Sequence, residues 1–172
     1  MRRIWDDERG ITLAEIVVAI AIIGIGLMAL ASVIPIAAYG VQEGNQLSTA
    51  TFLANARLEQ VQNARWACPP PAAPACSLPP AVDNIGVSTS STAAPQSGGT
   101  TTFPDESPMA APYAGYTRQV RITDCGVGAG CGGVVDSNLR QATVFVSYQP
   151  LTGVGQGSGP KTAVVTMLVA RK

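Results

Sequence analysis

The sequence predicts an α+β protein in which one long N-terminal helix packs on a C-terminal antiparallel β-sheet. An apolar run fills residues 11–40, a helical pattern of apolar residues continues through 41–66, and strand-like segments lie within 113–172. Strands that follow a helix are typical of the α+β class, in which helices cover one face of an antiparallel sheet. A polar leader, 1–10, and a Pro/Ser/Thr/Gly-rich loop, 67–112, complete the expected division of the chain.

The apolar run is long enough to cross a bilayer. A membrane helix needs about 20 apolar residues, and no residue from Ile16 to Tyr39 is charged. The run has one charge, Glu15, just inside its start, where a lone carboxylate is costly without a partner. A cleaved secretory signal has a shorter apolar region of about 7–15 residues. An ordinary membrane anchor explains the length of the run and leaves Glu15 without a role.

Charges around the run predict its orientation. Arg2, Arg3 and Arg9 precede it, and only Glu43 follows closely. Because basic residues favour the cytoplasmic side, we expect a single-pass protein of the inner membrane with a cytoplasmic N-terminus. The rest of the chain is then exported.

Gly24, Gly26 and Pro35 are expected to interrupt the apolar helix. Proline inside a helix removes a hydrogen bond and costs about 3 kcal/mol in water. Membrane helices tolerate it better, because neighbouring groups satisfy the freed backbone. We expect a bend near Pro35.

The second half of the helix is predicted to pack under the sheet. Its apolar residues recur at spacings of three and four, which is typical of an amphipathic helix. The stripe comprises Leu47, Ala50, Ala54, Leu58 and Val61. We expect the helix to run to about Trp66, before three consecutive prolines stop it.

The remaining segments predict a loop and three strands. Residues 67–112 show no lasting period and are expected to form a surface loop. Residues 116–123 and 142–149 alternate apolar and polar, as half-buried strands do. Residues 162–170 are apolar on both faces, which favours a central strand.

Four cysteines in a chain expected to be exported predict disulfides. They are Cys68, Cys76, Cys125 and Cys131. Four cysteines allow three pairings, and we favour the local one, in which Cys68 pairs with Cys76 and Cys125 with Cys131. Zinc is the competing hypothesis, but neither pair has the C-x-x-C spacing and no histidine is available.

Composition argues against several kinds of site. The chain has no histidine, the commonest general base and metal ligand, so we predict no enzyme, no metal and no cofactor. Asp105 and Glu106 are a weak carboxylate pair, because adjacent side chains in a loop seldom act together. Asp124 and Asp136 match no calcium loop and are expected at a solvated surface. Acidic and basic residues balance at 11 each, and no basic stripe indicates nucleic-acid binding.

The segment that begins at Gly10, G-ITLAE-IVVAIAIIGIG, resembles the class III signal of type IV prepilins and pseudopilins. Thr12, Leu13 and Glu15 match the family pattern, and Ile11 stands where the family usually has phenylalanine. The resemblance implies that prepilin peptidase cuts after Gly10 and that Ile11 is then N-methylated. It implies further that Glu15 pairs with the free amine of a neighbouring subunit, which is charged at neutral pH.

The same resemblance implies a type IV pilin fold and a filament in which helix is lost between about Gly24 and Pro35. The implied partners are other pilin or pseudopilin subunits, prepilin peptidase, the inner-membrane assembly machinery and the lipid bilayer. The stretches IVVAIAIIGIGLMALASV, ATFLANARLEQVQNAR and TAVVTMLVARK resemble PilV-type minor pilins most. A type II secretion pseudopilin is the alternative. A membrane-anchored exported enzyme or binding module is the alternative of another class.

Overall fold

The computed structural model describes residues 10–64, 66, 83–97, 100–101, 103–150 and 159–171. The chain divides into two compact units, which meet between Gln42 and Glu43. Residues 13–42 of the first unit are named the apolar segment, and the second unit, Glu43–Lys172, is named the head. The elements are α1 (Leu13–Asn63), β1 (Gln96–Ser97), β2 (Thr100–Thr101), β3 (Tyr116–Asp124), β4 (Leu139–Tyr148) and β5 (Lys161–Ala170).

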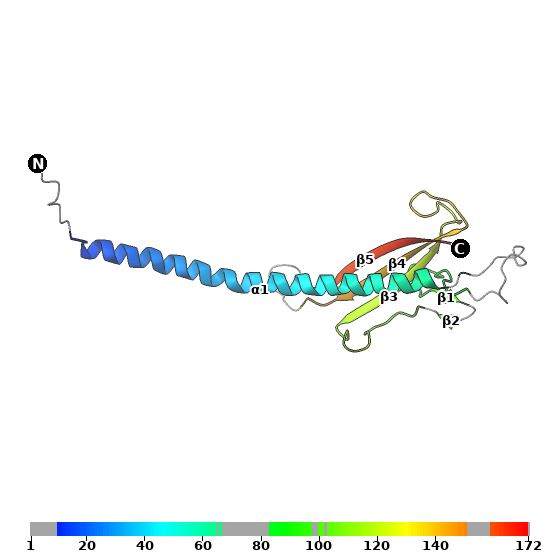
Figure 1. Cartoon of the computed structure of the whole chain (residues 1–172), viewed down its shortest axis with the longest axis horizontal. Helices are drawn as coiled ribbons and strands as arrows, with labels where there is room; N and C mark the ends of the chain where they lie inside the picture. The colour runs from blue at the N-terminus through cyan, green and yellow to red at the C-terminus, as the bar shows by residue number, and fades with distance from the viewer. Residues whose placement is uncertain are drawn as a thin grey trace, which may run out of the picture. The chain divides into compact units, whose positions relative to one another are not determined.

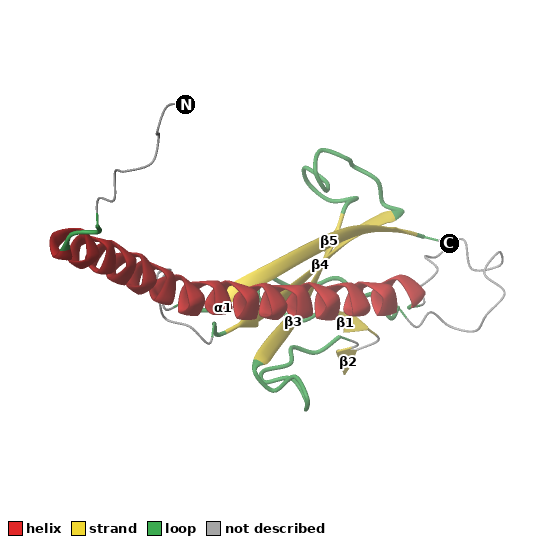
Figure 2. Ribbon diagram, turned by 60° about the vertical axis from the view of Figure 1, so that its left-hand side comes forward, coloured by secondary structure: helices red, strands yellow, loops and turns green. Residues whose placement is uncertain are grey.

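The head is built on a three-stranded antiparallel sheet in the order β3-β4-β5. In its register, Val144 at the centre of β4 faces Val120 on one side and Val165 on the other. The part of α1 that belongs to the head lies along one face of this sheet (Figure 1, Figure 2). These features confirm the predicted α+β class, and they are consistent with the type IV pilin fold.

The core of the head lies between α1 and the sheet. From α1 the buried residues are Ala50, Leu53, Ala54, Leu58 and Val61. The helical stripe is therefore confirmed at four of its positions, whereas Leu47 remains 48% exposed and Leu53 was not foreseen. On the sheet side the core takes Val120, Ile122, Ala142, Val144, Val146, Tyr148, Ala163 and Val169.

The three predicted strands are confirmed, with ends that move by at most three residues. The expectation that the last strand is central is wrong, because β4 is central and β5 lies at an edge. On β5, Val164 and Leu168 are 54% and 49% exposed. Its apolar pattern on both faces therefore reflects an uncovered outer face and not a central position.

Part of the segment expected to form a surface loop is packed into the core. Ile85 is fully buried, and Phe103 and Met109 are at most 7% exposed. β1 and β2 pair as a short antiparallel ladder within the same stretch. Single apolar residues scattered through a polar segment leave no periodic signal, so the sequence pattern could not place them. Residues 67–82 lie outside the described part of the chain.

α1 is one continuous helix of 51 residues that ends at Asn63, three residues before the expected end. It runs without a break through Gly24, Gly26 and Pro35, so the expected interruption is absent from this helix. A proline removes one hydrogen bond, and the turns on either side keep theirs. A bend near Pro35 and a loss of helix during assembly stay predictions.

Candidate functional site

The residues expected to be processed lie immediately before the helix. Gly10, Ile11 and Thr12 are non-helical and exposed, and α1 begins at Leu13. Ile11 is 74% exposed. The peptide bond between Gly10 and Ile11 therefore lies outside the helical hydrogen-bond ladder, where a peptidase can reach it.

Thr12 caps the helix. The Glu15 N–H is shared between the Thr12 carbonyl oxygen at 3.0 Å and the Thr12 hydroxyl oxygen at 3.3 Å. The Ile16 N–H also donates to the Thr12 carbonyl, at 3.2 Å. A threonine followed three residues later by glutamate is the signature of a capping box. The cap makes the helix begin two residues after the expected cleavage point. The sequence signal that could have predicted this cap is Thr-x-x-Glu at Thr12 and Glu15.

Glu15 lies in the first turn of α1. A carboxylate there is favoured by the helix dipole, by about 0.3–1 kcal/mol. Its side chain is exposed, and among the described residues no cation forms an ion pair with it. The carboxylate is therefore open to a charge supplied by another chain.

The apolar segment exposes its large side chains on every side of the helix. Leu13, Ile23 and Ile34 are 79%, 60% and 71% exposed, and the other large apolar side chains of the segment are exposed as well. By length and composition α1 can cross a membrane, and the most apolar window has none of its surface buried within the chain. A helix that is apolar all round needs lipid or other helices around it.

Asp105 and Glu106 do not act as a carboxylate pair. Asp105 accepts two hydrogen bonds from the Arg121 guanidinium, at 2.6 and 2.8 Å. Glu106 accepts from Arg57 and from Arg118, the latter at 2.8 Å. Each carboxylate is therefore held in a structural ion pair, and the weak catalytic hypothesis for these two residues is not supported by their geometry.

The Glu106 cluster joins three parts of the head. Arg57 comes from α1 and Arg118 from β3, and Arg118 also donates to the Leu53 carbonyl of α1 at 3.2 Å. Burial lowers the pKa of Arg118, and the Arg57 charge lowers it further, whereas Glu106 raises it. We did not foresee this cluster. The available signal was Arg118 itself, a cation placed on the apolar face of a predicted strand.

A second arginine cluster lies just beyond the C-terminal end of α1. Arg140 donates to both carboxylate oxygens of Asp83 and to the Ile85 carbonyl at 2.6–2.9 Å. Trp66 stacks against two guanidinium groups, 4.5 Å from that of Arg140 and 4.9 Å from that of Arg171. Such cation–π contacts stabilise by about 0.5–2 kcal/mol each. They anchor the chain just after the helix.

The Cys125–Cys131 disulfide is confirmed, with six residues of separation. The enclosed glycine-rich stretch forms turns, and Gly130 has a positive φ of 70°. A Cβ at Gly130 would lie 2.0 Å from the Val134 carbonyl oxygen, so only glycine fits. Cys68 and Cys76 lie outside the described residues, and their pairing stays a prediction.

Asp124 and Asp136 serve the turns next to the disulfide. The Asp124 carboxylate accepts the Gly126 N–H at 2.8 Å, and the Asp136 carboxylate accepts the Asn138 N–H at 2.8 Å. These local bonds are those of Asx-turns. In the part of the chain that the structure describes, no three His, Cys, Asp or Glu side chains converge as metal ligands would.

A family model described as the prokaryotic N-terminal methylation motif matches residues 5–31. The match covers the capped helix start, Glu15 and the beginning of the apolar segment. It supports a type IV pilin or pseudopilin, processed by prepilin peptidase and assembled with other pilin subunits, and it fits a membrane-anchored protein. Searches of curated proteins and of solved structures gave no match to this chain.

Proposed function

We propose that this chain is a minor pilin-like, non-enzymatic subunit of a type IV pilus or a related filament. The observation that carries the proposal is the coincidence of the methylation motif with the geometry at residues 10–15. There the expected cleavage point is non-helical, the helix start is capped, and the first-turn carboxylate of Glu15 forms no ion pair with a described cation.

Cleavage after Gly10 would free the amine of Ile11. That amine and Glu15 lie four residues apart, the amine just before the helix and the carboxylate in its first turn. In an array of parallel helices, the Glu15 carboxylate of one subunit then meets the amine of a neighbour shifted by about one turn, or about 5–6 Å. Because an unpaired charge in a bilayer costs about 2.5–3.5 kcal/mol at its centre, the pair favours one axial register over others.

The apolar segment supplies most of the cohesion in this proposal. It anchors the subunit in the inner membrane with a cytoplasmic N-terminus, as the arginines of the leader predict. Assembly then exchanges lipid around the exposed isoleucines and valines for the helices of other subunits. The head stays on the exported side, where its Cys125–Cys131 disulfide is chemically stable.

The finer assignment to the PilV-like minor pilins rests on the sequence resemblances in α1 and β5. The long segment between α1 and β3 supports a minor pilin over a small secretion pseudopilin.

A substitution series at Glu15 tests the proposal. Glu15→Gln removes the charge with little change in shape, and we expect about tenfold less of the chain in sheared filaments, equivalent to about 1.4 kcal/mol. Glu15→Asp keeps the charge and should retain more incorporation than Glu15→Gln. Quantitative immunoblots of filaments and membranes measure both.

The membrane pool provides the internal control, because each variant must still lose its leader there. Equal incorporation of wild type and Glu15→Gln, with normal processing, contradicts the proposed role of Glu15. Absence of the wild-type chain from filaments contradicts the filament function as a whole.

A further inference from the structure

The two edges of the head sheet differ. The outer edge of β3 is covered by the segment that precedes it. Glu106 and Arg118 exchange two backbone hydrogen bonds of 2.9 Å, and the Ser88 N–H donates to the Ile122 carbonyl at 2.8 Å. No further strand can therefore pair along this edge without displacing these bonds.

No described strand pairs with the outer edge of β5. In an antiparallel ladder, residues alternate between pairing with one neighbouring strand and with the other. Because Arg118 and Ile122 of β3 point outward, the register sends the odd-numbered residues of β5 toward β4. The outward backbone groups of β5 belong to Thr162, Val164, Thr166, Leu168 and Ala170. Among the described residues, no backbone group outside the ladder bonds to them.

This edge lacks the usual protection against pairing with another chain. Native proteins shield free edges with short strands, prolines or charged side chains. β5 is ten residues long, and from Thr162 to Ala170 it has no proline and no charge. The edge is therefore ready to accept an extended segment through backbone hydrogen bonds.

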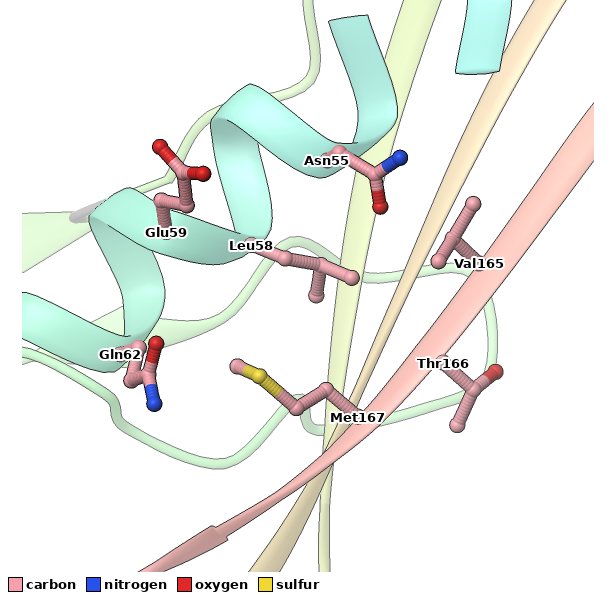
Figure 3. Close-up of a pocket in the computed structure, with 7 residues that line it drawn as sticks. All are labelled: Asn55, Leu58, Glu59, Gln62, Val165, Thr166 and Met167. Atoms are coloured by element: carbon pink, nitrogen blue, oxygen red, sulfur yellow. The ribbon is translucent and has the colours of Figure 1, made fainter. Parts of the chain in front are cut away.

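A groove of about 480 Å³ lies between α1 and β5. Its lining residues are Asn55, Leu58, Glu59, Gln62, Val165, Thr166 and Met167. In Figure 3, Leu58, Met167 and Val165 lie between the helix and the strand, and Asn55 points toward β5. The groove thus offers an apolar floor and amide groups on the helix beside the open edge.

Arg171 directly follows β5. Its guanidinium stacks on Trp66 at 4.9 Å, and its Nε is buried without a hydrogen-bond partner. Among the described residues, no acidic side chain forms an ion pair with it. At the other end of the strand, Lys161 is paired with Glu43. The unsatisfied charge is therefore at the C-terminal end of the edge.

We propose that the open edge of β5 receives an extended segment from a neighbouring filament subunit of different sequence. The segment pairs with Thr162–Ala170 and places an acidic side chain at Arg171. Opposite Glu59 the segment has a neutral or basic side chain, because a second acidic side chain there would be repelled by the Glu59 carboxylate. This inference rests on the proposed filament function and adds the chemistry of a partner.

A second copy of this chain is a poorer partner. Antiparallel pairing of two β5 edges about Thr166 sets Lys161 of one copy opposite Arg171 of the other. Like charges directly opposite each other destabilise a strand pair. Head-to-tail pairing would need an open β3 edge, which is covered by Ser88 and Glu106.

Amide hydrogen exchange at single-residue resolution tests the proposal on the full-length protein. In detergent, the outward amides of Thr162, Val164, Thr166 and Leu168 should exchange rapidly, while the intervening amides are protected by β4. In sheared filaments, we expect exchange of the outward amides to slow by about tenfold, equivalent to about 1.4 kcal/mol, since each gains a hydrogen bond. Unchanged exchange in filaments that contain the chain overturns the edge proposal and leaves the filament function standing.

Substitution of Thr166 adds an independent test. Thr166→Pro removes one outward N–H and spares the backbone bonds to β4, although it loses the 3.2 Å bond between the Thr166 and Thr143 hydroxyls. Protection of Val164 and Leu168 in filaments should therefore fall. Thr166→Val, which keeps the N–H, should behave as wild type. Loss of protection in both variants, or in neither, contradicts strand pairing.

A photo-crosslinking side chain at position 166 identifies the occupant by mass spectrometry. We expect adducts to an extended segment of another filament subunit that carries an acid near Arg171, and Arg171→Gln should reduce their yield severalfold. Adducts to β5 of a second copy, or none from intact filaments, overturn the proposed partner. If the chain itself is missing from filaments, both this inference and the proposed function fail.

Discussion

Thr12 determines where α1 begins, because its hydroxyl accepts the Glu15 N–H in the first turn. The same turn presents the Glu15 carboxylate, so the cap and the carboxylate that we propose for assembly lie within one helical turn. The pattern from Gly10 to Glu15 could be recognised in the sequence through its resemblance to a known signal, whereas the cap was not predicted. The ion-pair partner of Glu15 could not be observed, since the proposed amine exists only after cleavage and belongs to another chain.

Replacing Thr12 should loosen the start of the helix. Thr12→Ala removes the cap, which costs about 1 kcal/mol, and the Glu15 amide should exchange about fivefold faster in detergent. Thr12→Ser keeps a hydroxyl and should exchange nearly as slowly as wild type. Identical exchange in the alanine and serine variants would show that the cap does not hold the first turn.

Tyr148 makes the stability of the head depend on alkaline pH. Burial raises its pKa above the ordinary value of 10.0, and the neighbouring Tyr116 raises it further. The neutral phenol is thus favoured in the folded head, and this contribution is complete below pH 10.0 and is lost as pH rises through the folded pKa. The free energy of unfolding should therefore fall above pH 10.0.

Tyr148→Phe should flatten that decline, because phenylalanine cannot ionise. Urea titrations at several pH values, followed by tryptophan fluorescence, compare the two proteins. Tyr113→Phe is the matched control and should keep the wild-type slope. Equal slopes for wild type and Tyr148→Phe would exclude Tyr148 as the titrating group.

The segment before β3 shows what sequence patterns miss at the scale of elements. The helix stripe and the strands could be predicted because their periods repeat over many residues. The burial of Ile85 and Met109 could not be predicted, because each is a single apolar residue that packs in the core through contacts with residues far away in the sequence. The ion pairs of Asp83, Asp105 and Glu106 also join positions far apart in the chain. They give a non-periodic segment a defined structure.

Substitution of Glu106 tests whether these ion pairs stabilise the segment before β3. Glu106→Gln leaves two arginines, Arg57 and Arg118, close together without their shared anion. Removing one partner from a mostly buried ion pair destabilises by about 3–5 kcal/mol, and the partial exposure of Glu106 should reduce this to about 2 kcal/mol. Urea unfolding of the full chain in detergent measures the change. Glu59 is exposed, so the control Glu59→Gln should change the free energy of unfolding by less than about 0.5 kcal/mol. Equal changes for Glu106→Gln and Glu59→Gln would contradict the proposed role of Glu106.

The Cys125–Cys131 disulfide should stabilise the hairpin between β3 and β4. A loop of this size is expected to contribute about 2 kcal/mol by restricting the unfolded chain. Cys125→Ser combined with Cys131→Ser should lower the free energy of unfolding by about that amount in the same assay. A double variant as stable as the oxidised wild type would contradict the estimate.

As a whole molecule, the chain combines a head with its own core and an apolar segment that buries none of its most apolar window. Such a segment is stable only in lipid or among other helices. In the proposed function, the subunit therefore resides first in the membrane and then in the filament. Its length and composition were readable from the sequence. The uncovered edge of β5 was not, because strand order depends on pairings that no local pattern encodes.

The intact mass of the protein extracted from membranes tests the central claim most directly. The account predicts a chain that lacks residues 1–10 and carries one additional methyl group on Ile11. A polypeptide that still begins at Met1, or one that has lost the entire apolar segment, would contradict it.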